Sequence, residues 1–144
     1  MSLEDIFPML VAIIVLFVFI AFVYGIVGNN LEQRRVEATY ETAVSLSDTL
    51  YSRSVFVYAN KSGLFDSSKL DEYSSLYDEL SSMYGVAGYG FSIEVNDLAE
   101  PARHWTYAPD KVGTNAPEIA YPVAVRYSAG KINEGMLKVR VWRN

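Results

Sequence analysis

The chain has 144 residues, no cysteine and a formal net charge of −5. The lack of cysteine excludes disulfide bonds, thiolate zinc sites and thiol catalysis. Lysine and arginine residues are scattered along the chain, so no basic stripe indicates binding to nucleic acid. The length allows one membrane span and one small domain of roughly 100 residues.

Residues 6–28 form a single uncharged run, IFPMLVAIIVLFVFIAFVYGIVG, that is almost wholly apolar. About 20 such residues in a helix, rising about 1.5 Å each, cross a bilayer. A cleaved secretory signal would need a basic start and a shorter run, whereas the preceding segment contains Glu4 and Asp5 and no basic residue. A buried core helix is disfavoured, because the remaining residues could hardly cover a helix that is apolar all round. We therefore predict a retained membrane-inserting helix with Pro8 in its first turn.

The helix is predicted to continue past the apolar run, because neither glycine nor proline follows Asn29 and Asn30. Apolar residues then recur about once per helical turn, at Val36, Tyr40, Val44, Ser47 (weakly), Tyr51 and Val55. This face is expected to pack on the C-terminal domain. Residues 54–58 fit a strand equally well, so the end of the helix stays open. The predicted parts are a membrane-spanning or filament-core helix (1–30), its amphipathic continuation (31–53) and a small α+β head domain (54–144).

A turn and a second helix are predicted next. Residues 60–63, Asn-Lys-Ser-Gly, are typical of a turn, and Asp66, Ser67 or Ser68 can cap a following helix. The helix has Gly85 as its stop and carries on one face Leu70, Tyr73, Leu76, Tyr77, Leu80, Met83 and Tyr84. Its carboxylates are interpreted as a solvated face, not as paired catalytic acids, and they are Asp71, Glu72, Asp78 and Glu79.

After Gly85 the apolar period changes from helical to alternating. Residues 89–95 alternate as a half-buried strand, and the irregular segment 96–118 has room for a short strand at 105–107. Two further alternating runs, 119–127 and 137–141, are joined by turn residues at 128–130 and 133–135, which predicts an antiparallel hairpin. The predicted fold class is α+β: a long N-terminal helix, one short helix and an antiparallel sheet of three to five strands.

No constellation of residues indicates catalysis. His104 is the only histidine and is interpreted as a loop residue beside Trp105. Neither a nucleophile elbow nor a phosphate-binding glycine loop occurs. Five oxygen-bearing residues could hold calcium but lack the spacing of a calcium loop, so a solvated loop is favoured for Asn96, Asp97, Glu100, Asp110 and Glu118. We predict no enzymatic activity, no cofactor and no metal site.

Three motifs carry a resemblance to a known family. They are Gly63-Leu-Phe-Asp66 before the second helix, the run YPVAVRY at 121–127 and the run GMLKVRVWR at 135–143. With the apolar helix that leads into an amphipathic one, the chain resembles archaeal type IV pilin-like proteins, as a minor pilin or related surface-filament subunit. The resemblance implies a membrane precursor that is clipped just before the apolar helix. It also implies that copies then associate through these helices, which form the core of a filament.

The sequence departs from this family at the processing site. The expected basic and small residues before the clipped bond are missing from MSLEDIF. Either the precursor segment is already absent from this chain, or the protein stays unprocessed in the membrane. Bacterial-type pilins place a glutamate near the start of the mature helix, where it pairs with a neighbour's N-terminus, and Glu4 matches that role. The predicted assembly residues are Glu4, Pro8, Ile13, Phe17, Ile20, Tyr24, Gly25 and Gly28, the two glycines because small residues let helices approach closely.

Two signals disagree on the orientation of the chain in the membrane. Arg34 and Arg35 follow the span and no basic residue precedes it, which favours a cytoplasmic C-terminal domain. Asn60 begins an Asn-Lys-Ser glycosylation acceptor, as expected of an exported domain. Together with the family resemblance, this leads us to predict an extracellular C-terminal domain or an extracellular filament.

The predicted partners are further copies of the chain, membrane lipid before assembly, and other pilin-like or envelope subunits. The alternative function is a single-span membrane anchor for a secretion or pilus-assembly complex of the envelope. The absence of processing residues and the two arginines after the span favour this alternative.

Overall fold

The computed structural model describes residues 3–100, 103–114 and 116–144, and for 3–7 the backbone alone. The chain divides into two compact units, Met1–Glu37 and Ala38–Asn144. The first unit is helical. The second holds the end of that helix, two short helices and a sheet.

The helix α1 extends from Leu3 to Arg53, so the predicted continuation past Asn30 is confirmed. Pro8 lies inside α1 rather than in its first turn, which corrects the prediction. Its ring nitrogen has no hydrogen to donate to the carbonyl four residues earlier. The helix ends at Arg53, and the next residues form a turn instead of a strand. Only Val57 makes an isolated β-bridge there, to Phe65.

The buried face of α1 agrees with the predicted one only in part, since Ser47 is buried and Tyr51 packs against the core. It consists of Ala43, Leu46, Ser47 and Leu50, whereas Val36 and Tyr40 are more than half exposed. The small side chains of Ala43 and Ser47 allow close packing, and the Ser47 hydroxyl is satisfied by donating to the Ala43 carbonyl at 2.7 Å. Periodicity therefore identified an amphipathic helix and its core-facing residues near the C-terminal end, but not Ala43, Leu46 and Leu50.

The predicted second helix is broken into three pieces, α2 (Ser67–Glu72), a 3-10 turn η1 (Tyr73–Ser75) and α3 (Tyr77–Tyr84). Asp66 caps α2, since its Oδ1 accepts a hydrogen bond from the Ser68 amide at 3.0 Å. Gly85 ends α3 as predicted, although in an extended conformation (ψ 137°). The interruption at 73–76 prevents one apolar face from running through, so Leu70 and Leu80 are buried while Leu76, between them, is 38% exposed.

The five strands form one sheet in the order β1-β4-β5-β2-β3. Their bounds are β1 Leu64–Asp66, β2 Tyr89–Asp97, β3 His104–Tyr107, β4 Glu118–Arg126 and β5 Ile132–Arg143. The predicted strands and the antiparallel β4–β5 hairpin are confirmed. The short strand β1 was not predicted, and it pairs in parallel with β4, so the sheet is mixed. The α+β fold class is confirmed.

Two local predictions in the sheet are wrong. His104 is the first residue of β3, not a loop residue. Residues 133–135 lie within β5, where Asn133 pairs with Val125 and Gly135 pairs with Val123. The hairpin turns earlier, where the Tyr127 amide donates to the Lys131 carbonyl at 2.8 Å.

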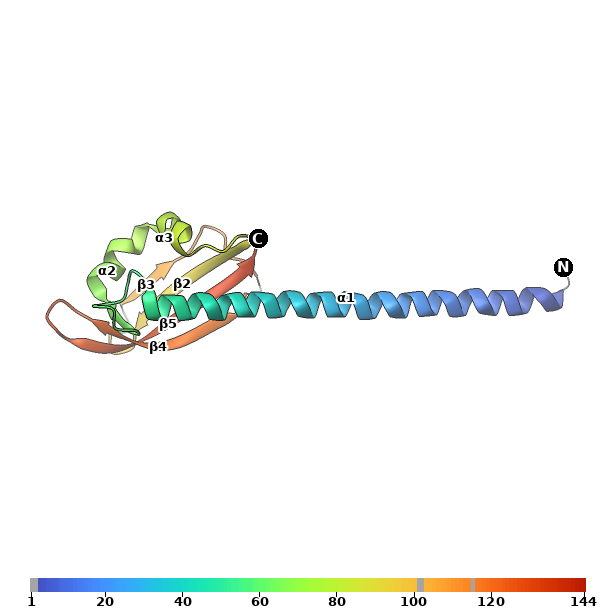
Figure 1. Cartoon of the computed structure of the whole chain (residues 1–144), viewed down its shortest axis with the longest axis horizontal. Coiled ribbons are helices and arrows are strands. Elements are labelled where there is room, and N and C mark those ends of the chain that lie inside the picture. Colours follow the sequence, from blue (N-terminus) through green and yellow to red (C-terminus); the bar gives the residue numbers. More distant parts are fainter. Residues whose placement is uncertain (1–2, 101–102, 115) are drawn as a thin grey trace. The chain divides into compact units, whose positions relative to one another are not determined.

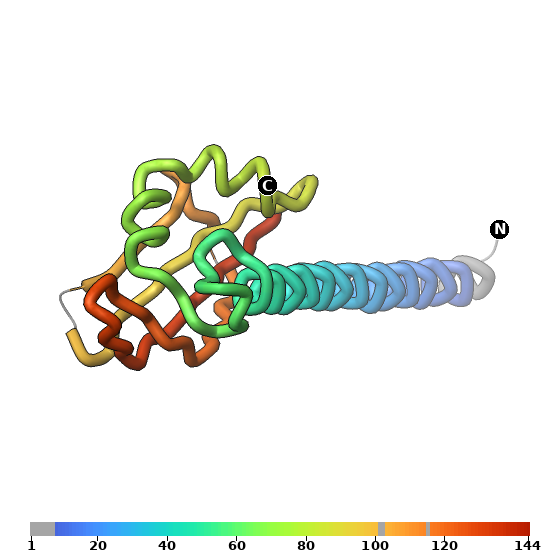
Figure 2. The backbone as a smooth tube through the Cα atoms, turned by 60° about the vertical axis from the view of Figure 1, so that its left-hand side comes forward, coloured from blue at the N-terminus to red at the C-terminus, as the bar shows by residue number. Residues whose placement is uncertain are grey.

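One face of the sheet packs against the helices and forms the core of the second unit. Buried Leu46 and Leu50 of α1 belong to the same cluster as Ile93 of β2 and Leu137 and Val139 of β5. Figure 1 shows the strands of this sheet. Figure 2 shows the chain end beside the segment before β2, where the Asn144 amide donates to the Gly88 carbonyl at 3.0 Å. The sheet is thus covered by helices on one face only.

Trp142 of β5 is buried on the opposite face of the sheet. Gly90 pairs with it across the strands, and a Cβ added to Gly90 would lie 2.5 Å from the indole Cε2. Gly113, in the loop between β3 and β4, has an equally close approach to Trp142, with a Cβ 2.6 Å from the indole Cδ1. Two glycines therefore make the room that the indole occupies.

We expect Gly90→Ala to destabilise the head by about 1–3 kcal/mol, because the new methyl group overlaps a buried ring that cannot move freely. In a Trp142→Val background the same substitution should lower the free energy of unfolding by almost nothing, since the indole ring is absent. Urea unfolding of the full chain in detergent, followed by tryptophan fluorescence with Trp105 present in all four variants, measures this coupling. Equal costs in both backgrounds would contradict the steric explanation.

Candidate functional site: an exposed apolar helix and a groove in the head

From Pro8 onward, α1 contains a helix that is long and apolar enough to cross a membrane once, and none of its apolar part is buried in the chain. The side chain of Phe17 is 68% exposed and that of Tyr24 is 76% exposed. Each large apolar side chain gains about 1.5–3 kcal/mol on leaving water. This surface therefore requires lipid or other protein around it.

Four of the predicted assembly residues recur at helical spacing on one face of α1. They are Ile13, Phe17, Ile20 and Tyr24, separated by four, three and four residues, and all are exposed. Gly28 continues this spacing, whereas Gly25 lies about 100° away around the helix. A Cβ at either glycine would meet nothing within 4 Å in this chain. The Glu4 side chain lies outside the described residues.

An open groove of about 540 Å³ lies in the second unit, between the last turns of α1 and the connection from α3 to β2. The α1 wall is lined by four small side chains at helical spacing, together with two larger ones, Glu41 and Leu46; the small ones are Ala38, Thr42, Ser45 and Thr49. The opposite wall includes the exposed apolar residues Met83 (46% exposed) and Val86 (44% exposed). On the α1 side the short side chains therefore leave room for an occupant, and on the opposite side the groove has an apolar rim.

Tyr84 fixes the two walls of the groove to each other. Its hydroxyl accepts a hydrogen bond from the Val55 amide, just beyond the end of α1, at 2.8 Å. Burial raises the pKa of the Tyr84 hydroxyl, although the hydrogen bond from Val55 opposes that shift. The hydroxyl therefore stays neutral at physiological pH, and the groove has a defined width.

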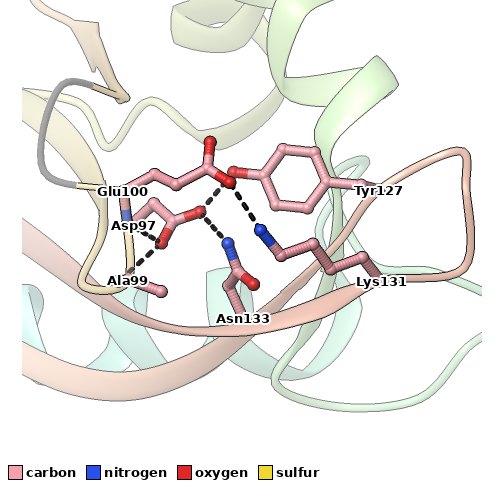
Figure 3. A network of polar contacts seen from close by, with 6 residues as sticks. All are labelled: Asp97, Ala99, Glu100, Tyr127, Lys131 and Asn133. Atoms are coloured by element: carbon pink, nitrogen blue, oxygen red, sulfur yellow. Dashed lines mark hydrogen bonds and ion pairs between the residues drawn. The ribbon is translucent and has the colours of Figure 1, made fainter.

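A buried carboxylate, Asp97, organises the opposite end of the sheet (Figure 3). Its Oδ2 accepts a short hydrogen bond from the Tyr127 hydroxyl and one from Asn133 Nδ2 at 2.7 Å. Its Oδ1 accepts from the backbone amides of Ala99 at 2.8 Å and Glu100 at 2.9 Å. The carboxylate thus holds the end of β2 to the β4–β5 hairpin.

The protonation of this cluster follows from its contacts. Burial by itself would raise the pKa of Asp97, but the hydrogen bonds from Tyr127, Asn133 and the two amides outweigh it, so the pKa is lowered. Burial and the hydrogen bond to Asp97 raise the pKa of Tyr127 to about 12. The cluster therefore holds one ionised carboxylate and a neutral phenol, an arrangement that stabilises the fold.

The other residues that the sequence marked for chemistry do not come together. Within residues 3–100, 103–114 and 116–144, the structure has no group of three or more His, Asp or Glu side chains placed to hold a metal ion. His104 is exposed on β3. Both Asp97 oxygens are occupied by the hydrogen bonds described above.

Asn60 lies exposed in the predicted turn and has a positive φ of 57°. It borders a second hollow, of about 570 Å³, together with Asp48, Ser52 and Arg53 at the end of α1. The side-chain amide is accordingly placed on the surface, as an acceptor of modification would need to be.

Sequence reasoning missed both the groove and the Asp97 cluster. The small residues of the groove were visible as a pattern at 38, 42, 45 and 49, with spacings of four, three and four residues. Met83 and Val86 had no local signal that placed them opposite that pattern. Asp97 had been grouped with loop oxygens, and its partners 30 and 36 residues away are brought to it by the sheet.

Comparison of the chain with models of protein families, with curated proteins and with solved structures found no match in any of the three.

Proposed function

We propose that the chain is a structural subunit of a surface filament of the archaeal type IV pilus-like kind, which assembles through its N-terminal helix. The observation that carries the proposal is that the apolar part of α1 is exposed around its whole circumference and continues without a break into the helix that packs in the head. A helix of this kind can pass from lipid to the apolar surfaces of identical helices. The head then remains outside, with one face of its sheet uncovered by helices.

The apolar face made by Ile13, Phe17, Ile20 and Tyr24 supports association between copies. Its spacing of four, three and four residues is that of a seam between helices. The open space at Gly25 and Gly28 allows neighbouring helices to come close at the end of the run. Such packing replaces lipid by protein without exposing the apolar surface to water.

The proposal is tested by tagging the C-terminus in the native host, shearing the cells and following the tag. We expect the tag in the sheared surface fraction, as high-mass material that resists mild detergent. Recovery of only monomeric chain from the membrane would contradict the proposal. A cytoplasmic protein followed in parallel shows whether the cells have lysed.

The second candidate is a single-span anchor for an envelope complex. It is favoured by the exposed Arg34 and Arg35 after the span, which would keep the head in the cytoplasm. In that case the tag stays in the membrane fraction, is released by detergent only, and is protected from protease added to intact cells.

A further inference from the structure

The groove in the head lies on a face of α1 that has the same spacing as the assembly seam. From Ile13 the spacings of three and four residues lead through Phe17, Ile20, Tyr24 and Gly28 to Leu31 and Arg35. The same series continues to Ala38, Thr42, Ser45 and Thr49, which form the α1 wall of the groove. Along this face of α1 the side chains change from mostly large ones to small ones where the groove begins.

We propose that this groove receives residues 24–35 of α1 from a second copy of the chain. The inference rests on the proposed self-association and adds the surface, the register and the direction of one contact. A displacement of 14 residues places Gly28 of the second copy opposite Thr42, and Leu31 opposite Ser45. Leu31 is 53% exposed in its own chain and gains apolar partners from the rim formed by Met83 and Val86.

Charge complementarity identifies the occupant. On α1, Glu41 lines the groove, and Asp48, seven residues further on, borders the second hollow; both are exposed, and neither has an ion pair among the described residues. The occupying segment ends in the basic pair Arg34 and Arg35. In the proposed register Arg34 comes level with Asp48, and Arg35 comes level with Thr49 of the groove wall. Ion pairs of this exposed kind select the register more than they add affinity.

The size of the groove is consistent with a helix as its occupant. Small residues on one helix let a second helix approach closely, and the α1 wall has no side chain larger than threonine at the four positions that repeat. The volume of about 540 Å³ holds several large side chains but not a second folded domain. The head of the second copy begins after residue 37, beyond the segment that enters.

The register has a consequence for when the contact forms. Fourteen residues along a helix are about 21 Å, so two copies whose spans lie at the same depth in a membrane cannot make this contact. It requires one copy to be displaced outward relative to the next, as in a growing filament. The contact therefore belongs to the assembled state and not to the membrane pool.

The lack of native cysteine makes disulfide cross-linking a clean test. Full-length Leu31→Cys and Ser45→Cys variants, with different C-terminal tags, are expressed together in the native host, and the cells are oxidised and sheared. We expect a disulfide-linked dimer that carries both tags in the sheared surface fraction, and at least about fivefold less of it in the membrane fraction. Co-expression of Gly28→Cys with Thr42→Cys reports the same register should either first variant fail to assemble.

Two matched pairs serve as controls. Gln33→Cys lies about 160° around the helix from Leu31 and is paired with Ser45→Cys. Leu31→Cys is also paired with Ser74→Cys, an exposed position in η1. Cross-linking of either control pair as strong as that of the test pairs would overturn the proposed register, and so would the absence of cross-links in surface polymer that forms normally. If the cysteine-free chain itself forms no surface polymer, the proposed function fails, and the docking with it.

Discussion

Replacing Phe17 with glutamate is expected to reduce the chain in the sheared surface fraction by at least tenfold. Phe17 is 68% exposed in the isolated chain, so the substitution leaves the head untouched. In a filament core the carboxylate would be buried among apolar helices, at a cost of several kcal/mol, and each 1.4 kcal/mol is a factor of ten in an equilibrium. Quantitative immunoblotting of sheared and membrane fractions measures the change.

Phe17→Leu is the matched control, because it keeps an apolar side chain of similar reach at the same position. It should retain most of the surface polymer. If Phe17→Glu assembled as well as the control, the face that contains Ile13, Phe17, Ile20 and Tyr24 would not be the seam between copies. The anchored-subunit alternative predicts that neither substitution changes the surface fraction, since none of the chain would be found there.

The second large effect is expected from Asp97→Ala, which should destabilise the head by about 2–4 kcal/mol. The substitution leaves a buried Asn133 amide, a phenol and two backbone amides without their acceptor. Urea unfolding of the full chain in detergent, followed by the fluorescence of Trp105 and Trp142, measures the loss. Both tryptophans lie in strands of the sheet, so the signal reports on the head rather than on α1.

Glu100→Ala is the control for that measurement. Glu100 lies beside Asp97 and pairs with Lys131 at 2.6 Å, but both side chains are about half exposed. Exposed ion pairs contribute about 0–1 kcal/mol, so this variant should be nearly as stable as the parent. A similar loss in the two variants would show that any change in this loop unfolds the head.

The pH dependence of stability should follow the pKa of Asp97. Because that pKa is lower in the folded chain than in the unfolded one, the carboxylate stabilises the fold above its unfolded pKa of about 3.9. The stabilisation is lost as the pH falls from there through the folded pKa. Asp97→Ala should remove this part of the acid sensitivity, so the difference in stability between parent and variant should shrink below about pH 4.

Features that depend on neighbouring residues alone were predictable. The apolar run 6–28, the alternation in β2, β4 and β5, and the β4–β5 hairpin follow from side-chain periodicity and turn residues. They were sufficient for the α+β class. A run that is apolar on all sides can be recognised as a membrane-type helix without knowledge of the residues around it, because any helix made from it exposes the same apolar surface.

Features that depend on distant residues were decided by the tertiary structure. The strand β1 has three residues, too few to show a period, and it exists because it pairs with β4 about 60 residues later. The buried face of α1 was set by the sheet that it packs on, so Ala43, Leu46 and Leu50 are buried while Val36 and Tyr40 of the predicted face stay exposed.

The same distinction applies to the candidate site. The seam at Ile13, Phe17, Ile20 and Tyr24 was determined by the sequence, because residues three and four apart share a helix face whatever the rest of the chain does. The groove was not, because its second wall, with Met83 and Val86, comes from the end of α3 and the connection to β2. That wall is held near the end of α1 by the hydrogen bond between Tyr84 and Val55, 29 residues apart. Local periodicity determines which surface a helix offers, and only long-range packing determines what stands opposite it.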